Sequence, residues 1–283
     1  MNHEITLEQF RRWLILYAQL IAEAETRLTE LDAAIGDADH GINMQRGMTR
    51  VHRRMEALAP PATNPVNDRG AESAPSPAEG AGEAEQIADI GTLLRHAAMT
   101  LISSVGGAAG PLYGAFFLWA AKSVGAVHTA DLNQLAIMLR SGLDGVQQRG
   151  KAQPGEKTMI DTLAPAIDAL EKACAQGLSL DAALAQAVSA AEAGMESTVA
   201  MQAHKGRASY LGPRSIGHPD PGAASAFLLV RAAATCLSSD YTKFATPTQP
   251  INDGESAQVR ATTGAAAAAV SAAVKPILRD LGR

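Results

Sequence analysis

The stretch TLEQFRRWLILYAQLIAEAETRLTEL, residues 6–31, decides the fold class of this chain. Its apolar residues recur at alternating steps of four and three, which places them on one face of an α-helix. These residues are Phe10, Leu14, Tyr17, Ile21, Ala24, Leu28 and Leu31. Thr6 followed by Gln9 resembles a capping box and marks the expected helix start. The segment therefore predicts a long amphipathic helix near the beginning of the chain.

Further stretches carry the same helical pattern. They lie at about 41–57, 86–104, 111–125, 130–149, 158–176, 180–202 and 222–238. No convincing run of alternating, β-branched residues predicts a strand. Alanine is very common and only 4% of residues are aromatic, a composition that suits closely packed helices better than a β-sandwich. The chain is therefore expected to be all-α, with about eight helices.

The overall composition excludes several classes of protein. With 283 residues and 47% hydrophobic content, the chain can build a substantial core and is not a disordered protein. A net charge of -5 without a Lys/Arg-rich run argues against nucleic acid as a partner. Neither a signal peptide nor a long apolar span is visible, so we expect a cytoplasmic protein without a membrane partner. Cys174 and Cys236 lie in apolar helical patterns and are expected to be reduced, buried thiols.

Two segments differ from the helical remainder. Residues 58–85 are rich in Pro, Ala, Gly, Ser and Glu, and too poor in large apolar residues to offset the entropy of ordering. We expect them to form a flexible insertion. Residues 239–283 begin with a Thr/Pro-rich connector at 246–250 and end in an alanine-rich stretch. The predicted division is a helical domain over 1–240 and an appendage over 241–283.

The loop after the first helix collects acidic side chains. Asp32, Asp37 and Asp39 fall within eight residues, punctuated by glycines, and are followed by His40 and Asn43. Such carboxylates repel one another unless a cation lies among them. Oxygen ligands without cysteine indicate Mg²⁺ or Ca²⁺ rather than zinc, and Mg²⁺ held by few carboxylates often completes its coordination with phosphate oxygens. The alternative interpretation is that Asp32 and Asp39 only cap helices and His40 is an ordinary loop residue.

Two more loops are chemically distinctive. SSVGGAAGP at 103–111 carries glycines that let backbone N–H groups approach a phosphate, although glycine pairs also occur where helices cross closely. It lacks the Lys-Ser/Thr ending of a P-loop. The connection 204–222 is rich in donors that could hold phosphate, or it is a solvated polar loop with structural histidines. Its polar residues are His204, Lys205, Arg207, Arg214, His218 and Asp220. Met159 is either a lid over a base or a core residue.

Four motifs together resemble one known family. GDADHGIN, LISSVGGAAGPLYG, PGEKTMID and HKGRASYLGPRSIGHPDPGA are similar, in the same order, to the characteristic loops of the L subunit of dihydroxyacetone kinases. The resemblance covers about residues 5–238. It implies an eight-helix antiparallel barrel whose interhelical loops hold a nucleotide at one end, in agreement with the helix count from periodicity.

The resemblance also implies roles for individual residues. Two Mg²⁺ ions would be held by Asp32, Asp37 and Asp39, and would bridge the phosphates of ADP or ATP. The nucleotide would be lined by His40, Gly41, Ile42, Asn43, Ala108, Ala109, Gly150, Met159, Arg207, Asp220, Pro221 and Gly222. His40 and Arg207 would support phosphoryl transfer. Ala109 stands where many relatives place a serine, so one hydroxyl contact with phosphate is expected to be missing.

The implied chemistry is phosphoryl transfer shared with other subunits. A separate K subunit would carry dihydroxyacetone, and a phosphohistidine on an M subunit would rephosphorylate bound ADP, as in the phosphoenolpyruvate–glycerone phosphotransferase. A homodimer is also considered. The alternatives are the L subunit of an ATP-dependent triose or tetrulose kinase, a Mg-ADP-binding regulatory module without turnover, and a metal-dependent phosphohydrolase.

Overall fold

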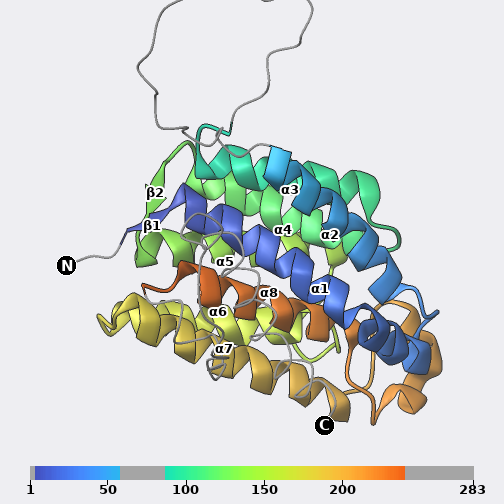
Figure 1. Ribbon diagram of the computed structural model, residues 1–283. Helices are drawn as coiled ribbons and strands as arrows, with labels where there is room; N and C mark the ends of the chain where they lie inside the picture. Colours follow the sequence, from blue (N-terminus) through green and yellow to red (C-terminus); the bar gives the residue numbers. More distant parts are fainter. Residues whose placement is uncertain (1–3, 58–86, 240–283) are drawn as a thin grey trace, which may run out of the picture.

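The computed structural model describes residues 4–57 and 87–239 of the chain, and this part is almost entirely helical (Figure 1). Its α-helices are α1 (Leu7–Ile35), α2 (His40–Ala57), α3 (Ile90–Ser104), α4 (Ala109–Val124), α5 (Leu132–Gly150), α6 (Ile160–Ala175), α7 (Leu180–Ser197) and α8 (Pro221–Leu237). The all-α fold and the count of eight are therefore confirmed for the described residues. The segments expected as an insertion, 58–85, and as an appendage, 241–283, lie outside them.

The helices close into a ring. Each helix packs against the next one along the chain, and α8 packs back against α1. The connections α1–α2, α3–α4, α5–α6 and α7–α8 all line one pocket, so they lie at the same end of the ring. Successive helices must then run in opposite directions. The arrangement is an antiparallel barrel with four connections gathered at one mouth (Figure 1).

Local capping explains where several helices begin. The Thr6 hydroxyl oxygen accepts a hydrogen bond from Gln9 N, and Thr6 N donates one to Gln9 Oε1, which confirms the expected capping box. Asp131 and Gln134 form a second capping box at the start of α5. Asp220 caps α8 through Ala223 N, and Pro221 occupies the first turn, where a missing N–H has no cost.

The structure adds short elements that the periodicity does not predict. Strand β1 (Ile5–Thr6) pairs antiparallel with β2 (Thr129–Ala130), a two-residue ladder too short to leave a sequence pattern. The helix expected at 180–202 ends at Ser197 and is followed by a 3₁₀ turn, η1 (Thr198–Ala200). A second 3₁₀ segment, η2 (Arg207–Ser215), lies in the connection to α8 and is kinked at Gly212.

The core fills the barrel with large aromatic side chains, mostly from α1 and α4, and with leucines, methionines and alanines from the other helices. Trp13 is 1% exposed and donates from Nε1 to Leu229 O across 3.0 Å, which ties α1 to α8. Small residues allow close crossing: a Cβ added to Gly142 of α5 would lie 2.8 Å from the Phe116 ring of α4. Cys174 and Cys236 are free thiols, as expected, but they are partly rather than fully buried. Among the described residues, no helix is long and apolar enough to cross a membrane.

Candidate functional site

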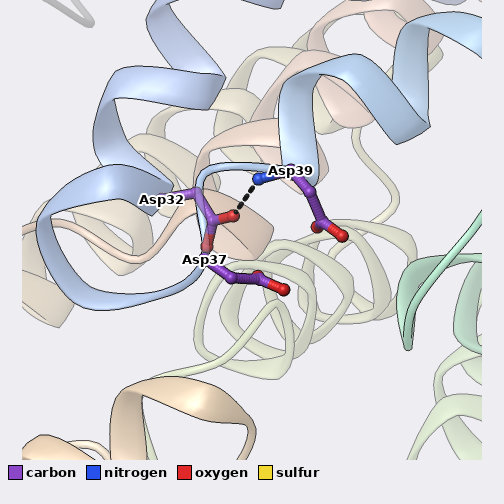
Figure 2. Close-up of side chains that lie close together, drawn as sticks. All are labelled: Asp32, Asp37 and Asp39. Carbon is purple, nitrogen blue, oxygen red and sulfur yellow. Dashed lines mark hydrogen bonds between the residues drawn. The ribbon is translucent and has the colours of Figure 1, made fainter.

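The acidic residues converge in the turn between α1 and α2 (Figure 2). One carboxylate oxygen from each of Asp32, Asp37 and Asp39 lies within 4.8 Å of the others. Asp32 is in the last turn of α1, whereas the other two follow Gly36 in the turn itself. Ala38, between them, adopts φ 60, a left-handed conformation that non-glycine residues seldom adopt. The turn therefore holds three hard oxygen donors together at some conformational cost, as a small divalent cation requires.

Asp32 has a structural role as well. Its Oδ2 accepts hydrogen bonds from Asp39 N at 2.8 Å and from His40 N at 3.1 Å, the backbone groups at the start of α2. The residue is only 8% exposed. Asp32 therefore caps the start of α2, as the alternative interpretation of the sequence expected, but the capping bonds use only one oxygen of its carboxylate. These bonds leave the second oxygen for another ligand, so capping and metal binding are compatible at this residue.

The glycine-rich turn lies beside the acidic cluster. A Cβ at Gly106 would lie 2.7 Å from Asn43 Oδ1, so a larger residue here would displace the Asn43 side chain of α2. Gly107 adopts φ 62, and α4 begins two residues later without a side-chain cap on its first turn. Ala109 and Pro111, in the first turn of α4, line the same pocket as the carboxylates. A helix N-terminus with free N–H groups attracts anions such as phosphate.

The wall between α5 and α6 is held by Asp161. Its carboxylate accepts from Gly155 N at 2.5 Å and from Thr158 N at 2.7 Å, which fixes the loop in front of α6. Gly150 ends α5 and Met159 precedes α6, and both line the pocket. Met159 is 4% exposed, so it belongs to the core and to the pocket wall at the same time. The two interpretations offered for Met159 are therefore compatible.

The fourth wall comes from the connection between α7 and α8. Arg207 Nε donates to Asp37 Oδ2 across 2.7 Å, so this connection reaches over to the acidic turn. At its other end, Asp220, Pro221 and Gly222 begin α8 and line the pocket. Burial raises the pKa of Asp220 to about 7, while its hydrogen bond from Ala223 N and the nearby Lys157 act in the opposite direction.

The His40 side chain is held in place by a short series of buried hydrogen bonds. Its Nε2 lies 2.9 Å from Ser225 Oγ, which in turn lies 2.8 Å from the Tyr113 hydroxyl. Burial lowers the pKa of the His40 imidazole, and the charges of Asp32 and Asp39 oppose that shift. These bonds join α2, α8 and α4 below the pocket and fix the imidazole ring against α8.

The pocket has a volume of about 510 Å³ and brings together most of the residues proposed from sequence. Those that line it are Asp32, Asp37, Asp39, His40, Asn43, Ala108, Ala109, Gly150, Met159, Arg207, Asp220, Pro221 and Gly222. Gly41 and Ile42 are not among the lining residues. Gly41 instead lies against α1, where an added Cβ would be 2.1 Å from Glu25 O, and Ile42 is 50% exposed. Of the other polar residues of the 204–222 connection, Lys205 also lines the pocket.

Sequence reasoning missed several participants. Lys157, Tyr113 and Ser225 were given no role, although Lys157 and Tyr113 line the pocket and Ser225 holds His40. Lys157 lies inside one of the distinctive motifs, PGEKTMID, and that position is the signal that could have drawn attention to it. Tyr113 likewise lies inside the motif LISSVGGAAGPLYG. Ser225 lies outside the four motifs, in an apolar helical stretch where a single hydroxyl is indistinguishable from a satisfied core residue.

Comparison with known proteins gives the family. The fold is that of a solved structure, the dihydroxyacetone kinase from C. freundii in complex with AMP-PNP and Mg²⁺, with a TM-score of 0.56 at 22% identity. That match covers 83% of this chain and 35% of the kinase chain. The family described as the DAK2 domain matches residues 67–235, more than half of the chain.

Relatives of similar length share much more of the sequence. The chain is 43% identical over 226 residues to the "PEP-dependent dihydroxyacetone kinase, ADP-binding subunit DhaL" of Escherichia coli (strain K12), covering 80% of this chain and 95% of that protein. It is 38% identical over 221 residues to the corresponding subunit of kinase 1 from Listeria innocua, covering 78% and 92%. The chain therefore belongs to the DAK2-domain family, in the group of dihydroxyacetone kinase ADP-binding subunits.

Proposed function

We propose that this chain holds ADP with magnesium in its pocket and serves as the ADP-binding subunit of a phosphoenolpyruvate-dependent dihydroxyacetone kinase. One observation carries the proposal: the three clustered carboxylates lie in the same pocket as the uncapped start of α4. A cation site next to a phosphate site is the arrangement that a metal–nucleotide complex needs. The two relatives whose matches cover most of this chain are both named as ADP-binding subunits, which agrees with a nucleotide in this pocket.

The metal is assigned to Asp32, Asp37 and Asp39, which we propose hold two Mg²⁺ ions. The donor set fits, because three carboxylates offer oxygens within 4.8 Å of one another and Asp32 keeps one oxygen outside its capping bonds. When bound, the ions would neutralise charge on the phosphate groups during transfer. The protein itself contributes a rigid turn, because Asp32 fastens the start of α2 to the end of α1.

The nucleotide is assigned to the rest of the pocket. Its phosphates would lie at Ala108 and Ala109, where the first N–H groups of α4 can donate to them. Its base would lie toward Gly150 and Met159, a wall that also includes the apolar Leu112 and Val146. His40, Asn43, Arg207, Asp220, Pro221 and Gly222 would complete the lining. Gly41 and Ile42 also remain proposed contacts, although they would have to act from outside the present lining.

The proposed transfer needs other subunits. Arg207 presents a guanidinium at the acidic turn, where it can hold a phosphoryl group in line with the nucleotide. We propose that a K subunit brings dihydroxyacetone to this mouth and that a phosphohistidine of an M subunit recharges the ADP. The word "subunit" in the relatives' names supports partners in general. A homodimer and the division into a nucleotide-binding domain over 1–240 and an appendage over 241–283 remain proposals too.

The test is the content of the purified protein. The full chain is purified without added nucleotide, dialysed in magnesium buffer and denatured, and the released nucleotide and metal are quantified. We expect near-stoichiometric ADP and about two magnesium ions per chain. Adding K and M partners with phosphoenolpyruvate should then yield triose phosphate, whereas the chain alone should release no phosphate.

Other outcomes would redirect the assignment. An empty protein that binds ATP reversibly would indicate the L subunit of an ATP-dependent triose or tetrulose kinase. Bound ADP without turnover in the presence of both partners would indicate a regulatory module. A protein with no nucleotide and no affinity for ADP or ATP would contradict the proposal.

A further inference from the structure

Lys157 is buried in an environment unusual for a lysine. The residue is only 1% exposed, although it lines the pocket. Its ammonium donates to two backbone carbonyl oxygens, Thr198 O and His218 O, the second at 2.5 Å. Within residues 4–57 and 87–239 it forms no ion pair with a carboxylate. A cation buried in this way is costly unless its donors are satisfied, so the two carbonyl bonds are essential to its placement.

The backbone at Lys157 is strained as well. Its φ is 61, in the left-handed region where a side chain with a Cβ is disfavoured by about 1 kcal/mol or more. A glycine would adopt this conformation without that cost, and glycines occupy such positions at Gly107, Gly155 and Gly206. The strain and the buried charge together indicate that the ammonium itself has a role at this position.

The two carbonyls belong to both ends of one connection. Thr198 begins the segment between α7 and α8, and His218 lies two residues before Asp220, at its end. The ends are also joined directly, because Asp220 N donates to Thr198 Oγ1 at 3.0 Å. The connection 198–220 is therefore a closed loop whose base is bridged by the Lys157 ammonium. Arg207 lies within this loop and faces Asp37.

The loop's other attachments to the wall in front of α6 are weak. His204 N donates to the neighbouring Glu156 O at 3.2 Å, and the Lys205–Glu156 ion pair is 3.8 Å long and partly solvated. Solvated ion pairs of this kind contribute little, about 0–1 kcal/mol. The charge-assisted bonds of Lys157 are stronger, and they act where the loop begins and ends.

We propose that Lys157 is a positioning residue of the pocket, whose ammonium fastens both ends of the 198–220 connection and so holds Arg207 over the acidic turn. The effect of Lys157 on nucleotide affinity rests on the proposed function, whereas the effect of Lys157 on the 198–220 connection does not. Burial lowers the pKa of the ammonium, and the nearby Asp220 and Asp161 oppose that shift and help to keep it charged.

The test compares amide hydrogen exchange in nucleotide-free protein for the wild type, Lys157→Met, and Lys122→Met. Lys122 is an exposed lysine of α4 and serves as the matched control. In Lys157→Met, exchange of the amides at 203–219 should accelerate about tenfold or more, because two buried charge-assisted bonds are lost. Exchange in α3, α4 and α5 should stay unchanged, and Lys122→Met should match the wild type throughout.

A second variant covers the case in which Lys157→Met does not fold. Lys157→Gln keeps a donor on a shorter side chain and should accelerate exchange in the same loop to a smaller degree. Unchanged exchange at 203–219 would overturn the proposal, because Lys157 would then have no role in the loop. Uniform acceleration across the barrel, or failure of both variants to fold, would also overturn it, because Lys157 would then stabilise the whole fold.

Nucleotide binding supplies the second measurement. Lys157→Met should weaken ADP binding about tenfold in magnesium buffer, and Lys122→Met should leave it unchanged. Unchanged ADP affinity in Lys157→Met would contradict the role in the pocket. If the wild type binds no ADP, the proposed function fails, while the exchange experiment still decides whether Lys157 positions the loop.

Discussion

Arg207 and Asp37 form an ion pair, 2.7 Å between Nε and Oδ2, that joins the α7–α8 connection to the turn between α1 and α2. The two side chains belong to segments 170 positions apart in the sequence. Their side-chain exposures are 68% and 32%, so water screens the pair and its contribution to stability is small, about 0–1 kcal/mol. Its importance is therefore expected to be geometric: it places a cation beside the acidic cluster.

Replacing Arg207 should separate stability from binding. Arg207→Ala should shift the free energy of unfolding by less than about 1 kcal/mol, because the ion pair is solvated. ADP retention should fall, since the guanidinium no longer faces the phosphates. Urea unfolding and equilibrium dialysis against ADP measure the two effects. A large stability loss with intact ADP binding would show that the residue is structural.

Asp37→Ala should abolish retention of both metal and nucleotide. The variant removes one of three clustered donors and leaves the phosphates facing the remaining carboxylates without enough cation. Released magnesium and ADP are quantified after denaturation, with Asp144→Ala on the exposed face of α5 as the control. Unchanged ADP binding in Asp37→Ala would refute the metal assignment.

Asp32 should respond differently to two substitutions. Asp32→Ala loses the cap on α2 and should destabilise the protein by about 1–2 kcal/mol. Asp32→Asn keeps an oxygen that accepts from Asp39 N, so most of that stability should remain, while magnesium affinity falls with the lost charge. Thermal unfolding in chelator, followed by magnesium titration, distinguishes the two roles. Equal stability of both variants would argue against the capping role.

Gly41→Ala tests whether this glycine serves packing. Its added methyl would lie 2.1 Å from Glu25 O and 2.4 Å from Thr29 Oγ1, so α1 and α2 must separate. We expect a loss of about 1–3 kcal/mol in the free energy of unfolding. Gly150→Ala is the comparison, because its methyl meets only the flexible end of Leu112 at 3.0 Å. A Gly41→Ala protein that is stable but no longer binds ADP would instead support the nucleotide contact proposed for this residue.

Asp220 should make stability depend on pH. Its folded pKa of about 7 lies above the ordinary value of 3.8, so the folded protein binds the proton more tightly than the unfolded chain. The resulting stabilisation is fully present below pH 3.8 and is lost as pH rises through about 7. Asp220→Asn keeps an oxygen for Ala223 N but removes this titration.

The measurement for Asp220 is urea unfolding of nucleotide-free protein at pH 5 and pH 8. Relative to the wild type, Asp220→Asn should become more stable by over about 1 kcal/mol as the pH moves from 5 to 8. The charged groups that act on Asp220, namely Lys157, Asp161 and Asp32, are present in both proteins. Parallel stability curves would show that this carboxyl does not titrate in the window.

Helix periodicity predicted the number and order of the helices because each one turns an apolar face toward the barrel. The ends of those helices were harder to predict, since they depend on contacts between distant residues. The expected helix at 180–202 stops at Ser197, where Thr198 turns to meet Lys157 and Asp220. Such contacts have no local signal.

In the candidate site, too, local sequence patterns predicted some features, whereas others depend on contacts between distant residues. Glycine and charge patterns identified the acidic loop, the 103–111 loop and the 204–222 connection, because each carries distinctive residue types. Periodicity could not place Ser225 and Tyr113 under His40, since both lie on helices whose other residues form the core. Nor could it separate Gly41 from its neighbours, because close packing against Glu25 depends on how α1 and α2 cross.

The closure of the ring brings the two ends of the barrel together. Gln9, in the first turn of α1, donates from Nε2 to the carbonyl oxygens of Leu237 and Ser238 at 3.4 Å. A domain whose N- and C-terminal ends are neighbours can be inserted into a longer polypeptide without distorting the surrounding protein, and it can be circularly permuted. The same barrel accounts for about a third of the C. freundii kinase chain. Joining residue 239 to residue 4 by a short linker, and opening the chain elsewhere, should therefore leave the barrel able to fold.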